Sequence, residues 1–322
     1  MKSSRLSLLL LLLLAGILLV PRAAHAQVSC TATHPTLNFG TVKVSTGSGA
    51  SDNGSINYRC QNTGAAAISF KLCVAIGTPG AGTPSRPVLQ GPGASILDFN
   101  VYADPLAGNV WDAGHPLSVP LSIAPGNTLT GTIPYYGSIP GNQTSAVAGT
   151  YQSGFSRTRL GYLVGSSCGA KPGFRFPSFT LNVKAKLGNA CVVSAGSNLN
   201  FGGAGGVAAG TPAVTGSDTI AVTCPNRTPY NVGLLPSDGD TGGAGIMKGA
   251  GGGVDTVQYQ LYQGAALSTP WGNTATRTSA GNGVHGIGNG LAQSLTVYAR
   301  TTSTTDVTPG TYTDTVQINV NY

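Results

Sequence analysis

Two similar halves make up this sequence, and the repeat constrains the fold more than any other feature. In each half a cysteine precedes a Leu-Asn-Phe-Gly motif, a second cysteine follows, and a tyrosine and a tryptophan then stand nine positions apart. The matching positions keep a nearly constant separation along the chain: Cys30 and Cys191, Leu37 and Leu199, Cys60 and Cys224, Tyr102 and Tyr262, Trp111 and Trp271, Gly149 and Gly310. Such a constant separation predicts two copies of one domain in tandem.

The composition favours strands over helices in both copies. Only 8% of the 322 residues are charged, against about 25% in an average domain, and all ten acidic residues are aspartates. Thr, Val, Ser, Asn and Gly are frequent instead, which is typical of strands joined by tight turns. Residues 312–322 show the strand pattern, since apolar and polar side chains alternate and only Asp314 interrupts the apolar face. We expect an all-β protein made of sandwich domains.

Residues 1–26 have the pattern of a secretory signal peptide. Lys2 and Arg5 precede an apolar run over residues 6–20, and an Ala-His-Ala sequence follows at residues 24–26. The alternative is a membrane anchor, although the run is shorter than the ~20 residues that a spanning helix needs. Cleavage after residue 26 removes three of the 17 basic residues and lowers the formal net charge from +7 to +4. No run of basic residues remains, so we expect an exported protein with no nucleic acid partner.

All six cysteines lie after this segment, in a part of the chain that we expect to fold in an oxidising compartment. An even number of cysteines without a Cys-x-x-Cys spacing indicates three disulfides rather than a zinc site. The repeat assigns one bridge to each copy, and the two remaining cysteines then pair within the first copy. The expected bridges are Cys30–Cys60, Cys191–Cys224 and Cys73–Cys168. Free buried thiols are the alternative.

The repeated motifs resemble the spore coat protein U domain family, and the resemblance covers nearly all of residues 27–322. It implies immunoglobulin-like, pilin-type sandwiches that lack their last strand, which a neighbouring subunit donates. It also implies a subunit of archaic chaperone–usher pili, whose two-domain members are similar to tip adhesins. The implied partners are a periplasmic pilus chaperone, an outer-membrane usher and the adjacent pilin subunit. The implied location is the periplasm in transit and then the cell surface, at the fimbrial tip.

One segment before Cys191 has the pattern of a donated strand. Along residues 179–187 apolar and polar side chains alternate, as a strand that enters an apolar groove requires. Its apolar face consists of Phe179, Leu181, Val183, Ala185 and Leu187. We expect this strand to complete the first domain within the same chain, and an ordinary last strand is structurally almost the same interpretation. The expected domains are 27–187, with 179–187 as the donor-like strand, and 188–322, the second domain lacking its final strand.

The two ends of the sequence differ in what they offer a neighbouring subunit. Three residues stand between the expected cleavage site and Cys30, and they span about 10 Å, too little to fill a groove. The last residues are expected to form the edge strand that accepts a neighbour's strand, with an apolar face of Tyr312, Val316, Ile318, Val320 and Tyr322. A subunit that accepts a strand and donates none belongs at the distal end of a fibre. We therefore expect a fimbrial tip subunit that mediates surface adhesion.

Enzyme-like motifs occur, but their surroundings do not support catalysis. Residues 281–286 fit the dinucleotide-binding pattern Gly-x-Gly-x-x-Gly, yet no alternation of strands and helices surrounds them. Residues 165–169 fit the hydrolase pattern Gly-x-Ser-x-Gly, yet Pro172 and Pro177 follow where that motif requires a helix. We expect no catalytic residues, no metal and no cofactor. The alternatives are a structural spore-coat or extracellular matrix protein of the same fold, and a secreted lectin or hydrolase.

Adhesion is expected in loops where the first domain departs from the second. Residues 78–92 are rich in Pro and Gly, and residues 137–149 belong to a connection that is longer than its counterpart in the second half. The candidate residues for contact with a host or abiotic surface are Pro84, Val88, Leu89, Ile139, Pro140 and Val147. The alternative is that these side chains pack against the sandwich.

Overall fold

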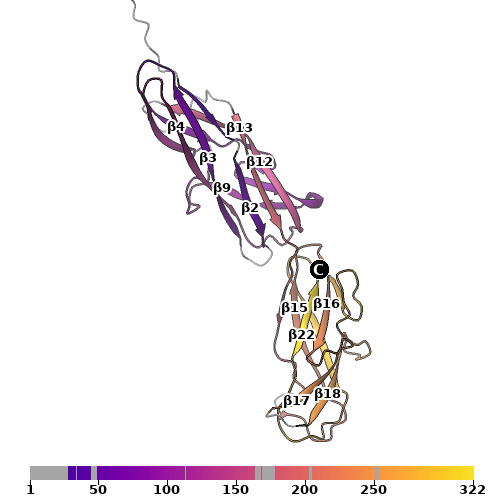
Figure 1. The fold of residues 1–322 in the computed structure, drawn as a ribbon. Coiled ribbons are helices and arrows are strands. Elements are labelled where there is room, and N and C mark those ends of the chain that lie inside the picture. The colour runs from indigo at the N-terminus through magenta and orange to yellow at the C-terminus, as the bar shows by residue number, and fades with distance from the viewer. Residues whose placement is uncertain are drawn as a thin grey trace, which may run out of the picture.

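The computed structural model describes residues 28–33, 35–44, 49–112, 114–163, 168, 178–202, 205–250 and 254–322. The predicted signal peptide and the Gly-x-Ser-x-Gly motif, apart from Cys168, lie outside the described residues. Figure 1 shows two β-sandwiches placed end to end, which confirms the expected all-β class. Within the described ranges, no helix has the length and apolar character needed to cross a membrane.

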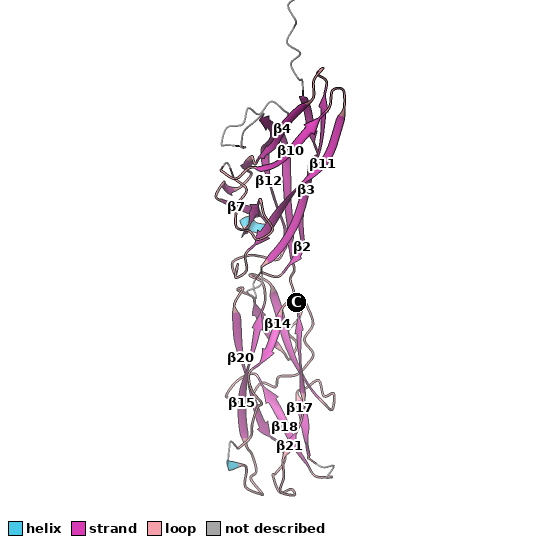
Figure 2. Cartoon of the chain, turned by 90° about the vertical axis from the view of Figure 1, so that its left-hand side faces the viewer, coloured by secondary structure: helices cyan, strands magenta, loops and turns pink. Residues whose placement is uncertain are grey.

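Domain 1 consists of two sheets (Figure 2). One apolar core lies between them. The first sheet has the order β1 (Val28–Ala32), β3 (Ala50–Asn62), β11 (Thr128–Ile139), β9 (Asn100–Tyr102). The second has the order β10 (Leu117–Ile123), β4 (Ile68–Ala75), β12 (Gly149–Leu163), β13 (Ser178–Leu187), β2 (Thr36–Val42). Shorter strands extend the second sheet: β5 (Thr78–Pro79), β6 (Gly82–Thr83), β7 (Arg86–Gln90), β8 (Ile96–Asp98). The 3-10 helix η1 (Pro92–Ala94) lies between β7 and β8.

Domain 2 repeats this plan with fewer strands in its second sheet. Its first sheet has the order β14 (Val192–Ala195), β15 (Thr215–Thr223), β20 (Ala292–Thr301), β18 (Thr256–Tyr262), β17 (Ala244–Gly249), β21 (Tyr312–Thr313). Its second sheet has the order β19 (Val284–Ile287), β16 (Pro229–Pro236), β22 (Val316–Asn321). The three strands β19, β16 and β22 correspond to β10, β4 and β12 of domain 1. Among the described residues of domain 2, no strands correspond to β13 and β2.

The repeated tryptophans have the same structural role in both domains. Trp111 and Trp271 are each 1% exposed. The indole N–H of Trp111 donates to the carbonyl of Val74 at 3.0 Å, and that of Trp271 donates to the carbonyl of Val232 at 2.9 Å. Each tryptophan therefore fills the core and satisfies a buried carbonyl of the second sheet.

The structure contains three disulfides, which join Cys30 to Cys60, Cys73 to Cys168 and Cys191 to Cys224. Cys30 and Cys60 lie directly opposite each other on β1 and β3, so this bridge links two paired strands. These are the pairs that the repeat indicates, and a disulfide of this kind stabilises a domain by about 2–4 kcal/mol.

The two domains touch through the connection between β11 and β12. The backbone N–H of Asn226 donates to the carbonyl of Ala146 at 3.2 Å, and its side-chain amide donates to the carbonyl of Ser145 at 2.9 Å. Val147 and Asn226 also form a parallel β-bridge. Residues 145–147 of domain 1 therefore lie at the junction, next to domain 2.

Candidate strand-acceptor site

Strand β13 completes the core of domain 1. It runs antiparallel to β12 on one side and parallel to β2 on the other, with Ala185 opposite Tyr151 and Val183 opposite Leu37. Its inward side chains are at most 5% exposed: Phe179, Leu181, Val183, Ala185, Leu187. Burial of a large apolar side chain contributes about 1.5–3 kcal/mol, so this strand carries a substantial part of the stability of domain 1.

The matching place in domain 2 is open at the edge of β22. One side of β22 pairs with β16, from Val316 opposite Pro236 to Asn321 opposite Asn231. No described residue pairs with its other side. The repeated Leu-Asn-Phe-Gly motif shows the consequence, because residues 37–40 belong to β2, whereas residues 199–202 form no strand. Without the intervening strand, this segment has no backbone partner to pair with.

The core of domain 2 is correspondingly incomplete. Counted over the residues that the structure describes, its apolar cluster holds 11 buried residues, against 32 in domain 1. A further group packs on this cluster but is only partly buried: Cys191, Leu199, Phe201, Met247, Val284, Leu295, Val316, Ile318, Val320, Tyr322. Leu37 and Phe39, the counterparts of Leu199 and Phe201, are 0% and 9% exposed. Leu199 and Phe201 were not among the groove residues expected from the sequence, although their alternation within a repeated motif is a signal for that role.

The free edge of β22 carries none of the usual devices that prevent edge-to-edge pairing. Its sequence, Val-Gln-Ile-Asn-Val-Asn, contains no charge and no proline. Natural edge strands are commonly protected by such residues, because an unpaired row of N–H and C=O groups invites another strand. Its polar side chains point to the loop before β19: the Asn319 amide donates to Oδ1 of Asn273 at 3.0 Å, and that of Asn321 to the carbonyl of Ala275 at 3.2 Å. These contacts hold β22 in place and leave its outer edge available.

The expected acceptor strand over 312–322 is interrupted, and Tyr312 does not belong to the open edge. Tyr312 and Thr313 form β21, which pairs with β17 in the first sheet. The chain crosses to the second sheet at Asp314, whose carboxylate accepts hydrogen bonds from Ser237 and, at 2.6 Å, from the hydroxyl of Tyr259. Asp314, which interrupts the apolar face in the sequence, therefore lies where the chain passes from the first sheet to the second and not within a single strand.

Three of the six candidate adhesive residues are buried, which corrects that prediction for them. Leu89 and Ile139 are 0% exposed and belong to the apolar core of domain 1, and Val88 on β7 is 9% exposed. Val147 contacts Asn226 at the domain junction. Pro140 is exposed but begins the same junction connection, and Pro84 is exposed beside the cavity described below. Four of the six candidate residues therefore pack within domain 1 or lie at the domain junction, and only Pro84 and Pro140 are exposed.

The glycine motif at residues 281–286 lies on a turn that leads into β19, and a strand rather than a helix follows it. This arrangement lacks the helix N-terminus that holds a pyrophosphate in dinucleotide-binding folds. Over the described part of the chain, no three His, Cys, Asp or Glu side chains gather in a way that could hold a metal ion.

Comparison with known proteins agrees with this architecture. One curated relative, Protein U of Myxococcus xanthus, is 29% identical over 154 residues, which are 44% of this chain and 83% of that protein. A chain of the CsuC–CsuE chaperone–tip adhesion subunit pre-assembly complex, from the archaic chaperone–usher Csu pili of Acinetobacter baumannii, is similar in fold. It superposes with a TM-score of 0.50 at 16% identity, over 91% of this chain and 100% of that chain.

The family model described as Spore Coat Protein U domain matches two regions, residues 17–157 and residues 178–319. Together these regions span most of the sequence, one in each half of the repeat. The two sandwiches, the repeated cysteines and both matches lead to one conclusion: the chain belongs to the spore coat protein U domain family.

Proposed function

We propose that this chain is an adhesive tip subunit of a chaperone–usher fibre, assembled by strand donation at the open edge of β22. The observation that carries the proposal is the contrast between the domains. Domain 1 has its groove filled by β13, whereas domain 2 presents the same groove with half-buried apolar walls. A strand from a neighbouring pilin would run along β22 as β13 runs along β12, and residues 199–202 would pair with its other side.

The residues at which the two family matches begin support the idea that β13 is a donor strand that completes domain 1 of the same chain. Each match begins at the same distance before the first cysteine of its repeat, at residue 17 before Cys30 and at residue 178 before Cys191. The second match therefore begins with β13, which belongs by sequence to the second repeat but lies in the sheet of domain 1. The equivalent segment of the first repeat falls in the predicted signal peptide. Cleavage after residue 26 would remove this counterpart of β13, which supports the distal position.

The proposal is tested by supplying domain 2 with a strand. The sequence of residues 178–187 is appended after Tyr322 through a flexible linker that matches the length of the connection from β12 to β13. We expect the melting temperature of domain 2 to rise by about 10 °C or more, because a few kcal/mol shift a domain of this size by that amount. The matched control carries Leu181→Asp and Val183→Asp in the appended copy only. If domain 2 melted at the same temperature in the two fusions and in the parent chain, the proposal that it accepts a strand would be refuted.

The distal position is tested by the mature N-terminus. Mass spectrometry of the exported protein is expected to show Gln27 as the first residue. A mature chain that keeps a strand-length segment before Cys30 would contradict the tip assignment, even if domain 2 accepted a strand.

The proposed partners of this chain would all bind at the open edge of β22. A periplasmic chaperone would cover β22 until an outer-membrane usher exchanges it for the adjacent pilin. Solved relatives in fold include a chaperone–tip adhesion subunit complex, which is consistent with such a partner. Ile318→Asp and Val320→Asp should abolish co-purification with the chaperone, whereas Gln317→Asp on the outer face should not. Chaperone binding that survives both groove substitutions would argue against this edge.

Adhesion belongs to the end of domain 1 that points away from domain 2. The connections β3–β4 and β10–β11 lie there, because Asn62 and Thr128 stand at the ends of their strands opposite to the junction. Both present small exposed apolar residues, which are Ala65, Ala66, Ala67, Ala124 and Pro125. Fibres with Ala66→Asp and Ala124→Asp should lose attachment to a host or abiotic surface, while Ser118→Asp on the flank of β10 should not. Normal attachment by the double variant would exclude this end.

A further inference from the structure

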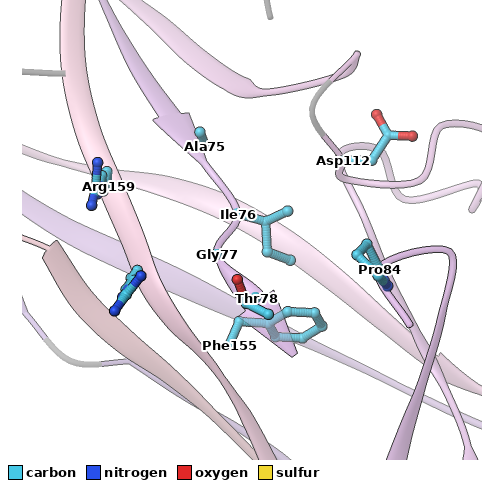
Figure 3. A pocket seen from close by; sticks show the side chains of 9 residues that line it. Ala75, Ile76, Gly77, Thr78, Pro84, Asp112, Phe155 and Arg159 are labelled. Carbon is cyan, nitrogen blue, oxygen red and sulfur yellow. The ribbon is translucent and has the colours of Figure 1, made fainter. Parts of the chain in front are cut away.

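A cavity of about 390 Å³ opens on the flank of domain 1, away from the open edge in domain 2. Figure 3 shows Ile76, Thr78 and Phe155 at its centre, Arg159 on one side and Asp112 on the other. Its walls come from β12, the β4–β5 connection and the loop that follows β9. The volume lies in the range of small-molecule sites, about 300–1,000 Å³.

A β-bulge in β12 fixes the basic wall of this cavity. β12 pairs with β13 as far as Phe155 and again from Thr158, so Ser156 and Arg157 have no partner there. Arg157 adopts a φ of 59°, a left-handed conformation that non-glycine residues rarely adopt. The buried hydroxyl of Thr158 accepts from the N–H of Gly77 at 3.1 Å and donates to the carbonyl of Phe155 at 3.2 Å. Bulges held in this way commonly redirect a side chain toward a functional site.

The bulge brings two arginines to the same cavity. Arg157 and Arg159 both line it and both are exposed to solvent. Neither guanidinium has a hydrogen bond or an ion pair with any described residue, in contrast to Arg86, which pairs with Asp98 at 2.7 Å. Two arginines without acidic partners are well suited to a carboxylate, whose two oxygens match the planar donors of a guanidinium.

The opposite wall presents a hydrogen-bond acceptor. Oδ1 of Asp112 accepts from the backbone N–H groups of Gly114 and His115, at 2.8 and 2.9 Å. Partial burial raises the pKa of Asp112, but the backbone N–H groups of His115 and Gly114, together with the His115 ring at 3.1 Å from Oδ1, outweigh this effect, so its pKa is below the usual value. The carboxylate is ionised at neutral pH and can accept hydrogen bonds from hydroxyl groups. Between the two walls, Ile76 supplies an apolar floor.

We propose that this cavity binds an acidic sugar, a hexose ring that carries a carboxylate. The two arginines hold the carboxylate, Asp112 accepts hydrogen bonds from ring hydroxyls, and Ile76 lies against the apolar face of the ring. A simple inorganic anion would use only the basic wall and leave most of the volume to water. In domain 2, β22 takes the place of β12 and contains no charged residue, so the site belongs to domain 1 and not to the shared sandwich. Its occupation does not depend on strand donation.

The test is calorimetric titration of the full exported chain with sodium glucuronate, next to glucose and sodium sulfate. The key variant combines Arg157→Gly with Arg159→Gln. Glycine removes the guanidinium and suits the positive φ, so this variant is expected to fold. The matched control is Arg59→Gln, which removes an exposed arginine on β3. Circular dichroism and the melting temperature verify the fold of each variant.

We expect glucuronate to bind more tightly than glucose or sulfate, and its affinity to fall as salt screens the arginines. Each lost charged hydrogen bond should weaken binding by about tenfold or more, so the double variant loses about a hundredfold while Arg59→Gln is unchanged. Equal affinity for sulfate and glucuronate, no glucuronate binding, or full binding by the folded double variant would each overturn the proposal. None of these results bears on the melting experiment for domain 2.

Discussion

Tyr135 on β11 stands directly opposite Gly54 on β3, and its ring occupies the space where a side chain at position 54 would begin. Domain 2 repeats the arrangement with Tyr259 on β18 over Gly245 on β17. Both tyrosines are almost fully buried, at 0% and 4% exposed. A glycine that weakens a strand by itself is thus covered by an aromatic ring from the neighbouring strand, which restores packing on that face.

This contact makes the two glycines intolerant of any side chain. Gly54→Ala and Gly245→Ala should each lower the free energy of unfolding by about 1–3 kcal/mol, because the added methyl group collides with a buried ring. Urea unfolding followed by tryptophan fluorescence measures this, since each domain holds one tryptophan. Gly264→Ala is the control, because a Cβ there meets no atom within 4 Å. If both substitutions changed the free energy of unfolding by no more than an ordinary surface substitution does, about 0.5 kcal/mol, the tyrosine rings would not limit the space at these glycines.

The same two tyrosines differ in their hydroxyl groups. Burial raises the pKa of both, but the hydroxyl of Tyr135 has no hydrogen-bond partner among the described residues, whereas that of Tyr259 donates to Asp314. Tyr135→Phe should therefore leave stability unchanged or raise it by up to about 1 kcal/mol. Tyr259→Phe should cost about 1–3 kcal/mol, because Asp314 loses a donor where the chain changes sheets. Chemical denaturation of both variants measures the two changes in the free energy of unfolding. Equal changes for Tyr135→Phe and Tyr259→Phe would contradict the different roles of the two hydroxyl groups.

Strand β13 should stabilise domain 1 although it precedes domain 2 in the sequence. Leu181→Ala is expected to cost about 2–5 kcal/mol, as is usual for a buried leucine. The unfolding transition of domain 1 should shift while that of domain 2 stays in place, and differential scanning calorimetry resolves the two. Asn182→Ala, on the exposed face of the same strand, should change stability by less than about 0.5 kcal/mol. A shift in domain 2 instead would place the strand in the other sandwich.

Strand donation should order a second segment of domain 2. In the uncomplemented chain the amides of residues 199–201 are expected to exchange with deuterium rapidly, while those of residues 37–39 in β2 exchange slowly. Fusion of the donor sequence after Tyr322 should slow exchange at 199–201 toward that of 37–39, which serve as the internal reference. Equal protection of both segments before fusion would show that domain 2 needs no added strand.

Features that depend on local pattern and on repetition could be predicted from the order of the residues alone. Alternating side chains identified residues 179–187 as a strand with one buried face, because a strand exposes opposite sides at successive residues. The constant separation of motifs identified two domains of one kind. Composition excluded a helical protein, and the repeat indicated the bridged pairs that the structure contains.

Which surfaces those patterns face depends on contacts between distant parts of the chain, so it became visible only in the folded protein. Val88, Leu89 and Ile139 resembled exposed loop residues in the sequence, yet they are buried, since burial depends on strands that are distant in the chain. The change of sheet at Asp314 depends on Tyr259 and Ser237, neither of which lies near it in sequence. The cavity beside Arg157 depends on a bulge held by Gly77 across the sheet. The local alternation of side chains predicts whether a segment forms a strand. The neighbours of that strand depend on packing between residues that are far apart in the sequence, so a short stretch of sequence cannot predict them.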